Sequence, residues 1–361
     1  MSSEFYFSFH APVADSPQDA VLALRAACLS RLDEAGLRPE SLVLLRFFCS
    51  DVYTQAPLVE RLWPLDVPCQ RVCIGQAPLD SAFLSLQAYC VDGPVEKRLE
   101  DDGSLVLRHG VWESLWTLDY PPAPADSESQ SDAVIASLRE KLQRRGMTLE
   151  RDVIRTWYYV RDVDNNYAGM IRSRVRHYEA SGLTPQTHFI ASTGIEADAP
   201  RPDVLTWLHS HAEKGLQPDQ VTWLKAEDHL SPTHVYGVNF ERATRVVYGD
   251  RAHCRISGTA SIDREGHVLH KGDVLRQFER AVENVEALLH EGGMELRHLQ
   301  AATIYLRDAH DYPRLAPLVR KLLPADCAVN VTRGPVCRPD WLVEIEAEAV
   351  APWNSPFPSF A

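Results

Sequence analysis

GDVLRQFERAVENVEALLHEGG (residues 272–293), with ATIYLRD (residues 302–308) shortly after it, is the stretch of sequence that decides the fold. In the first part, apolar side chains recur every three or four positions, at Val274, Phe278, Val282, Val285 and Leu289. That spacing is typical of a helix with one buried face, and the paired glycines mark its end. The apolar run at 302–308 predicts a buried strand. A helix around 315–323 and a strand over 341–347 complete one structural unit.

The same order of elements returns near the start of the chain. A predicted helix ends at Gly36, and a predicted buried strand covers residues 42–51. When Gly36 is placed on Gly293, Asp51 at the end of that strand falls on Asp308 without a gap. The motif Leu-Val-x-x-Leu-x-Pro then follows the strand in both copies. We interpret the two stretches as diverged copies of one unit.

A fainter third copy lies between them. Its predicted helix ends at Gly146, a strand follows over 154–162, and a basic helix comes next. Closing strands are expected over 188–195 and 204–208. The run PPAPADSESQS (121–131) is typical of a linker. The predicted organisation is a degenerate N-terminal domain over 1–120, a linker over 121–131, a middle unit over 132–245 and a C-terminal unit over 246–361.

Composition and charge narrow the class of protein. The formal net charge is −13, from 50 acidic and 37 basic residues. A field of that sign repels phosphate backbones, so no nucleic-acid partner is expected, whereas a locally basic pocket for a small anion is compatible with it. No apolar stretch approaches the roughly 20 residues that span a bilayer, so no membrane association is expected.

The chain start carries no secretory signal pattern, so a cytoplasmic location is expected. In that compartment the 8 cysteines are expected to be reduced thiols. Cys69 and Cys73 have no second Cys/His pair at a convincing spacing, so neither a metal nor a cofactor is predicted.

The C-terminal copy resembles a known superfamily. The resemblance rests on ISGTASID (256–263), HKGD (270–273), the pattern TxYLxD (303–308) and VEIEA (343–347). These segments are similar to the YjgF/Rid proteins, also called endoribonuclease L-PSP-like. The resemblance implies an α/β (α+β) fold in which mixed sheets are backed by helices, and homotrimers with clefts between subunits. Three such units in one chain would form an intrachain pseudo-trimer, so a monomer is expected.

One feature of the Rid deaminases is missing. They carry an arginine 15 residues before the first glutamate of the closing strand, and here that position is Val329. The resemblance therefore disfavours a Rid-type enamine or imine hydrolase, because the arginine that clamps the substrate carboxylate is absent.

A second resemblance fits better. The segment PVCRPDWLVE (335–344) resembles the chorismatase signature, in which a cysteine precedes a catalytic glutamate by seven residues, here Cys337 and Glu344. RTW (155–157) and SGTAS (257–261) are similar to further segments of that family. The resemblance implies cleavage of chorismate, with release of pyruvate and of a hydroxybenzoate or dihydroxy-cyclohexadienoate.

The closing strand supplies the predicted acid. Glu344 and Glu346 share one face of the strand, since side chains alternate. The N-terminal copy has Ser85 and Gln87 at the same places, so the fold does not itself require the charge. Protonating the methylene carbon of an enol ether needs a carboxylic acid with a raised pKa. We predict that Glu344 is this acid and that Cys337 forms part of the pocket wall or positions the substrate.

A dicarboxylate such as chorismate needs two cationic groups, and arginine suits bidentate binding. The candidates are Arg155, Arg242, Arg307 and Arg338, with Arg155 and Arg338 favoured. The predicted pocket is completed by Tyr158, Tyr236, Ser257 and Gly258. The basic run 172–176 and the pair His209 and His211 are instead predicted to lie on the surface.

Two alternative functions are predicted in addition to the chorismatase-like enzyme. One is the Rid-type enamine or imine hydrolase, and the other is a non-catalytic protein that binds small carboxylates. In each of these, the expected ligand is a small-molecule carboxylate.

Overall fold

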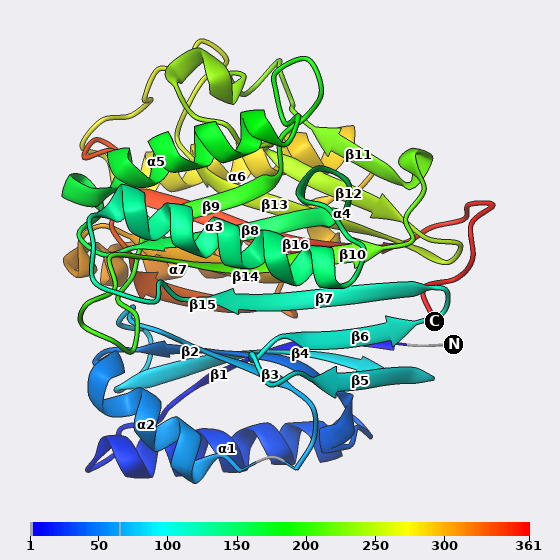
Figure 1. Cartoon of the computed structure of the whole chain (residues 1–361). Coiled ribbons are helices and arrows are strands. Elements are labelled where there is room, and N and C mark those ends of the chain that lie inside the picture. The colour runs from blue at the N-terminus through cyan, green and yellow to red at the C-terminus, as the bar shows by residue number, and fades with distance from the viewer. Residues whose placement is uncertain (1–2, 65) are drawn as a thin grey trace.

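Three sheets backed by helices make up the molecule (Figure 1). The computed structural model describes residues 3–64 and 66–361, apart from the side chain of Tyr236. None of the helices in this part of the chain is long and apolar enough to cross a membrane.

The N-terminal unit is a four-stranded sheet of order β1-β4-β2-β3 with two α-helices. Its strands are β1 (Ser3–His10), β2 (Leu42–Cys49), β3 (Gln70–Ile74) and β4 (Leu84–Asp92). Its helices are α1 (Pro17–Glu34), α2 (Val52–Leu62) and the 3-10 turn η1 (Pro39–Ser41). Ser16 begins α1 as an N-cap, because its hydroxyl accepts a hydrogen bond from the Asp19 amide.

The middle unit is a six-stranded sheet of order β5-β6-β7-β10-β8-β9. Its strands are β5 (Val95–Leu99), β6 (Leu105–His109), β7 (Trp112–Asp119), β8 (Val153–Val160), β9 (Ala191–Glu196) and β10 (Thr206–Lys214). Its helices are α3 (Ser127–Arg144), α4 (Leu149–Asp152) and α5 (Val163–Ala180).

The C-terminal unit has a six-stranded sheet of order β11-β12-β13-β16-β14-β15. Its strands are β11 (Val221–Leu224), β12 (Ala243–Val247), β13 (Arg251–Ala260), β14 (Leu299–Leu306), β15 (Ala328–Arg333) and β16 (Val343–Pro352). Its helices are α6 (Val274–Glu291) and α7 (Tyr312–Leu322). The 3-10 turns of this half are η2 (Pro218–Gln220), η3 (Thr233–Tyr236), η4 (Leu296–His298) and η5 (Ala309–Asp311).

The three units share one topology, which confirms the predicted fold class. The orders β1-β4-β2-β3, β7-β10-β8-β9 and β13-β16-β14-β15 are the same, and in each the last pair is parallel while the others are antiparallel. The first helix of each unit ends at a glycine with φ near +70°, namely Gly36, Gly146 and Gly293. Glycine adopts this left-handed conformation without strain, which explains the shared stop signal.

The predicted boundaries differ from this division of the chain. The strands over 95–119 extend the middle sheet rather than the N-terminal one, because β7 pairs with β10. Helix α3 begins at Ser127, inside the predicted linker, with Asp126 as its N-cap. Strands β11 and β12 belong to the C-terminal sheet. Alternating apolar residues identify a strand but not its partner, so the sequence alone does not show which sheet each of these strands joins.

The units are arranged in a ring. A side chain from the central closing strand of each unit reaches a neighbouring unit, always in the same cyclic direction. The contacts are Gln87 Nε2 to the Ala302 carbonyl at 3.0 Å, His209 Nε2 to Gln70 Oε1 at 2.9 Å, and Arg155 Nη2 to Glu346 Oε2 at 2.9 Å. The three units therefore form an intrachain pseudo-trimer. His209 and His211 lie on the central strand β10 and are buried, so their predicted surface position is wrong.

Candidate active site

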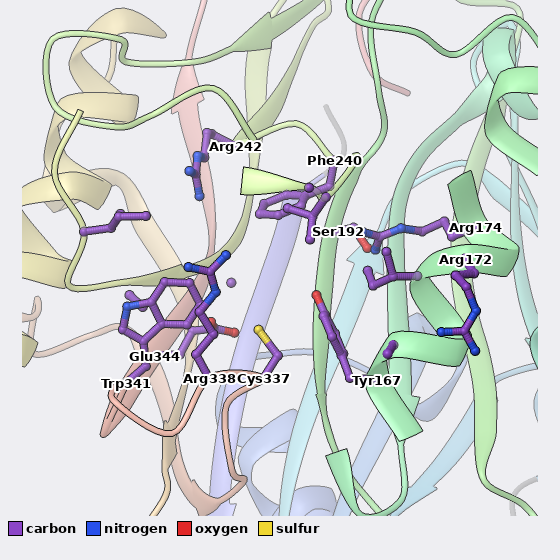
Figure 2. Close-up of a pocket in the computed structure, with 18 residues that line it drawn as sticks. Tyr167, Arg172, Arg174, Ser192, Phe240, Arg242, Cys337, Arg338, Trp341 and Glu344 are labelled. Atoms are coloured by element: carbon purple, nitrogen blue, oxygen red, sulfur yellow. The ribbon is translucent and has the colours of Figure 1, made fainter. Parts of the chain in front are cut away.

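A cavity of about 420 Å³ lies where the middle and C-terminal units meet (Figure 2). The middle unit contributes residues of α5 and β9 to its walls. The C-terminal unit contributes residues of β13 and β16 and the segments 237–242 and 337–341. A volume of this size is typical of sites for small molecules.

Glu344 projects into this cavity from β16 and is only 6% exposed. The neighbouring strand β13 has a β-bulge at Ser257–Gly258, where its register with β16 shifts. The bulge brings the backbone of Gly258 against the carboxyl group of Glu344. A methyl group on Gly258 would lie 2.2 Å from Glu344 Oε1, so glycine is the residue that lets the carboxyl occupy this position.

Glu346, two residues further along the same strand face, is held in a different way. Arg46 Nη2 donates to its Oε1 at 3.1 Å, and Arg155 Nη2 donates to its Oε2 at 2.9 Å. The hydroxyl of Thr193 and the indole N–H of Trp157 donate to the same carboxylate at 2.6 Å and 3.0 Å. This carboxylate is buried but fully paired, as a buried charge must be.

The two carboxyl groups consequently differ in protonation. Burial raises the pKa of Glu344 to about 8, the negative charge of Glu346 adds to this, and Arg155 and Arg242 oppose it. Burial also disfavours ionisation of Glu346, but Arg46 and Arg155 outweigh it and lower the pKa of that group. Near neutral pH, Glu344 therefore carries a proton while Glu346 is ionised.

Two arginines and a thiol lie beside Glu344 in the cavity wall (Figure 2). Arg242 donates from Nη2 to the Ser231 carbonyl at 2.7 Å, and the guanidinium group of Arg338 lies 5.0 Å from the ring centre of Trp341. Burial, followed by the charge of Glu344, raises the pKa of Cys337 to about 12. Cys337 is thus a neutral thiol rather than a nucleophilic thiolate.

The cavity brings together most of the predicted site residues. Glu344, Cys337, Arg242, Arg338 and Gly258 all line it. Three others lie outside its wall. Arg155 pairs with Glu346, Tyr158 is fully buried behind Arg174, and Ser257 bonds the Ser192 amide and the Glu241 carbonyl.

Two predicted residues remain, Arg307 and Tyr236. Arg307 pairs with Asp164 and does not line the cavity. Tyr236 ends η3, and its side chain lies outside the described residues.

Arg174 lines the opposite wall of the cavity but was not among the site residues predicted from the sequence. The basic run 172–176 was predicted to be solvated, and this holds for Arg172 and Arg176, which are exposed and pair with Glu128. Arg174 instead is 1% exposed. A signal was available, because Met170, Arg174 and Tyr178 recur at four-residue spacing and form the buried stripe of α5.

The candidate metal ligands lie away from this cavity. Among the described residues, one group brings three ligand atoms close together, namely Asp263, Glu265 and His267. It is a solvent-facing turn after β13, and none of its members lines the cavity. Such clusters are common without an ion.

Comparison with known proteins agrees with this architecture. The family model of endoribonuclease L-PSP matches residues 243–351. A RutC family protein of Pyrococcus abyssi is 35% identical over 98 residues, which are 26% of this chain and 75% of that protein. A 3-hydroxybenzoate synthase of Streptomyces hygroscopicus is 27% identical over 254 residues, or 63% of this chain and 70% of the relative. A crystal structure of a chorismatase superposes with a TM-score of 0.69 at 17% identity, and covers 97% of this chain and 98% of that one.

The chain therefore belongs to the YjgF/Rid superfamily, which includes the RutC and endoribonuclease L-PSP proteins. Its three-unit architecture is that of the chorismatase, and its 254-residue sequence match is to the 3-hydroxybenzoate synthase, so the predicted resemblance to chorismatases is confirmed. The predicted relationship to a family of enzymes is confirmed.

Proposed function

We propose that this protein cleaves the enolpyruvyl ether of chorismate, or of a closely related cyclic dicarboxylate, and releases pyruvate. The observation that carries the proposal is the carboxyl group of Glu344. It is buried, its pKa is raised to about 8, and it faces a cavity that also contains Arg242 and Arg338. A general acid needs a pKa close to the working pH, and this is the value that the site provides.

The proposed reaction begins with proton transfer from Glu344 to the terminal methylene carbon of the enolpyruvyl group. The carbon–carbon double bond supplies the electron pair, and the ether carbon becomes an oxocarbenium ion. Capture of this cation by water, followed by loss of the ring alcohol, gives pyruvate and a dihydroxy-cyclohexadienoate, with one water consumed. Capture by a ring hydroxyl, followed by loss of pyruvate and aromatisation, gives a hydroxybenzoate with no net water.

The charges around Glu344 suit this chemistry. The enolpyruvyl carboxylate is attached to the carbon that becomes cationic, so it must bind on the same side of the cavity as the acid. Arg242 and Arg338 lie on that side and are the groups that we assign to it (Figure 2). The neutral thiol of Cys337 packs beside them and limits the space in which the side chain of the substrate can rotate.

The relatives support the substrate class. The name of the chorismatase refers to chorismate, and the name of the 3-hydroxybenzoate synthase refers to a hydroxybenzoate product. The sequence match to the synthase favours a hydroxybenzoate as the product. The rival Rid-type hydrolase is disfavoured, because Val329 on β15 offers no charge at the position of the clamping arginine.

Pyruvate release from chorismate tests the proposal, with product separation to distinguish hydroxybenzoates from dihydroxy-cyclohexadienoates. We expect Glu344→Gln to lower the rate of release by roughly 100-fold or more, because it removes the general acid. Glu283→Gln, which changes an exposed glutamate of α6, is the matched control and should leave the rate unchanged.

Two results would contradict the proposal. One is full activity of the folded Glu344→Gln variant. The other is release of ammonia from an enamine substrate without release of pyruvate from chorismate, which would favour the Rid-type hydrolase. Ligand-induced stabilisation by chorismate with no turnover would indicate a carboxylate-binding protein.

A further inference from the structure

Arg174 is a buried cation that faces the cavity from the wall opposite Glu344 (Figure 2). It comes from α5, is 1% exposed, and its guanidinium group lies 5.4 Å from the ring centre of Tyr158. The neighbouring arginines of α5 are satisfied by carboxylates, since Arg172 and Arg176 both bond Glu128. Arg174 has no ion pair with any carboxylate in the described part of the chain.

The hydrogen-bond donors of Arg174 and of its neighbour Asn239 are only partly satisfied. Its Nε donates to Oδ1 of Asn239 at 2.8 Å. Its Nη2 is buried and has no hydrogen-bond partner among the described residues. The amide Nδ2 of Asn239 is also buried without a partner in the same part of the structure, and Asn239 as a whole is 5% exposed. Two neighbouring side chains thus each hold a donor that lacks an acceptor.

Buried donors without acceptors are costly, and the cost is greater for a charged group. Such groups are rare in native proteins, and in the wall of a cavity a bound ligand is the partner that can complete them. The missing partner must accept hydrogen bonds and carry negative charge, since one donor is a guanidinium group with no counter-ion. A carboxylate meets both conditions, and its two oxygens can accept from both side chains.

We propose that Arg174 and Asn239 form a carboxylate subsite that binds the ring carboxylate of a cyclic dicarboxylate. The assignment of the ring carboxylate rests on the proposed function, because the enolpyruvyl carboxylate must stay with the reacting carbon beside Glu344. The subsite itself rests on the unpartnered donors alone. It defines the substrate class, because a ligand with one carboxylate cannot satisfy both ends of the cavity.

The subsite also joins two separate elements of the fold. Arg174 belongs to α5 of the middle unit, whereas Asn239 belongs to the segment 233–242 of the C-terminal unit. That segment is held internally by the Thr233 hydroxyl, which donates to the Phe240 carbonyl at 2.6 Å. A carboxylate bound by both side chains would add a second link beside the existing Arg174–Asn239 bond.

Calorimetric binding of two stable probes tests the subsite without any turnover. The first is 3-(1-carboxyethoxy)benzoate, a saturated dicarboxylate that has no enol ether to protonate. The second is 2-phenoxypropanoate, which lacks the ring carboxylate. We expect the native protein to bind the first probe roughly 10- to 100-fold more tightly, as for charge-assisted hydrogen bonds of about 1.5–3 kcal/mol.

In Arg174→Met this preference should fall to within about threefold, because only the contact with the ring carboxylate is lost. In Asn239→Ala it should fall less far, since a neutral donor is removed. Arg176→Met, two residues along the same helix and outside the cavity, is the matched control and should retain the full preference. Arg174→Lys keeps the charge without the forked donors, and should show an intermediate preference if Arg174→Met fails to fold.

An unchanged preference for the dicarboxylate in folded Arg174→Lys or Arg174→Met would overturn the subsite. So would an equal stabilisation by inorganic phosphate, because the site would then accept any anion. The two proposals fail separately. A protein that binds the dicarboxylate through Arg174 but releases no pyruvate from chorismate retains the subsite and loses the proposed reaction.

Discussion

Glu344 and Glu346 show how far neighbouring groups can separate two chemically identical residues. Both are buried on one face of β16. Glu346 accepts hydrogen bonds from Arg46 and Arg155 and stays ionised, and its charge helps to keep the proton on Glu344. The paired carboxylate is thus part of the reason that the other is an acid.

The pH dependence of pyruvate release should report this proton. Because the pKa of Glu344 is raised to about 8, the proposed acid is present below that pH. We expect kcat/KM to be level from about pH 6 to pH 8 and to fall about tenfold per unit above it. Steady-state rates between pH 6 and pH 10 provide the measurement. A rate that already falls tenfold per unit from pH 6 upward, as for a glutamate with the ordinary pKa of 4.5, would show that the cavity does not hold the proton.

Protein stability should depend on pH through the same residue. A carboxyl whose pKa is higher in the folded state binds its proton more tightly there, so the native state loses stability as pH rises from about 4.5 to about 8. Between pH 6 and pH 9 the native protein should lose about 3 kcal/mol more than Glu344→Gln, which cannot ionise. Urea unfolding at both pH values measures this difference. Parallel losses in the two proteins would contradict the assignment.

The sequence allowed Glu344 to be predicted but not its electrostatic setting. The Glu-x-Glu pattern on a strand and the spacing from Cys337 are both local, so they can be read from the chain. Arg46 is 300 residues away from Glu346, and Arg155 is 191 residues away. Arg155 was predicted to bind substrate because no local pattern shows that a distant carboxylate already neutralises it.

At the scale of elements, the β-bulge in β13 is what lets a carboxyl group lie against a strand. At the bulge, the hydroxyl of Ser257 accepts from the Ser192 amide and donates to the Glu241 carbonyl. Gly258 faces Glu344. Bulges commonly redirect a residue in this way beside functional sites.

Replacement of Gly258 by alanine should therefore impair activity more than stability. The added methyl group would lie 2.2 Å from Glu344 Oε1, so the carboxyl must move from its position. We expect kcat of pyruvate release to fall by at least about tenfold, while the free energy of unfolding falls by about 1–3 kcal/mol. Ser257→Ala serves as the control, because it should cost stability through lost hydrogen bonds without moving Glu344. Normal kcat in Gly258→Ala would show that the contact is not needed.

Helix α5 shows both the value and the limit of periodicity. A basic helix was predicted directly after the strand over 154–162, and α5 covers Val163–Ala180. The basic run 172–176 was predicted to be solvated as a whole, so Arg174 was predicted to lie in solvent with its neighbours. The buried arginine lies on the apolar stripe because a cavity behind it makes room for the guanidinium group.

At the scale of the whole molecule, the three units meet at three equivalent junctions, and one of them carries the proposed acid. The strand registers place Ser85, Trp207 and Glu344 at corresponding positions of the three closing strands, as they do Gln87, His209 and Glu346. Ser85 donates to Asn330 of the C-terminal unit at 2.5 Å, whereas Trp207 stacks on Tyr159 of its own unit with ring centres 4.1 Å apart. Neither of these two positions carries a carboxyl group, and the catalytic proposal concerns the third.

This arrangement predicts a monomer that unfolds as one body. The trimers implied by the family resemblance close their ring between chains, whereas here the ring of contacts closes within one chain. The ion pair between Arg46 and Glu346 joins the N-terminal and C-terminal units, and Arg155 adds the middle unit to the same carboxylate. Light scattering should give a mass near 40.6 kDa, and thermal unfolding should show a single transition by circular dichroism and by tryptophan fluorescence. In Arg46→Met, loss of one partner of a buried charge should lower stability by about 3–5 kcal/mol. A threefold larger mass, or separate transitions for the units, would mean that the ring is not closed by these internal contacts.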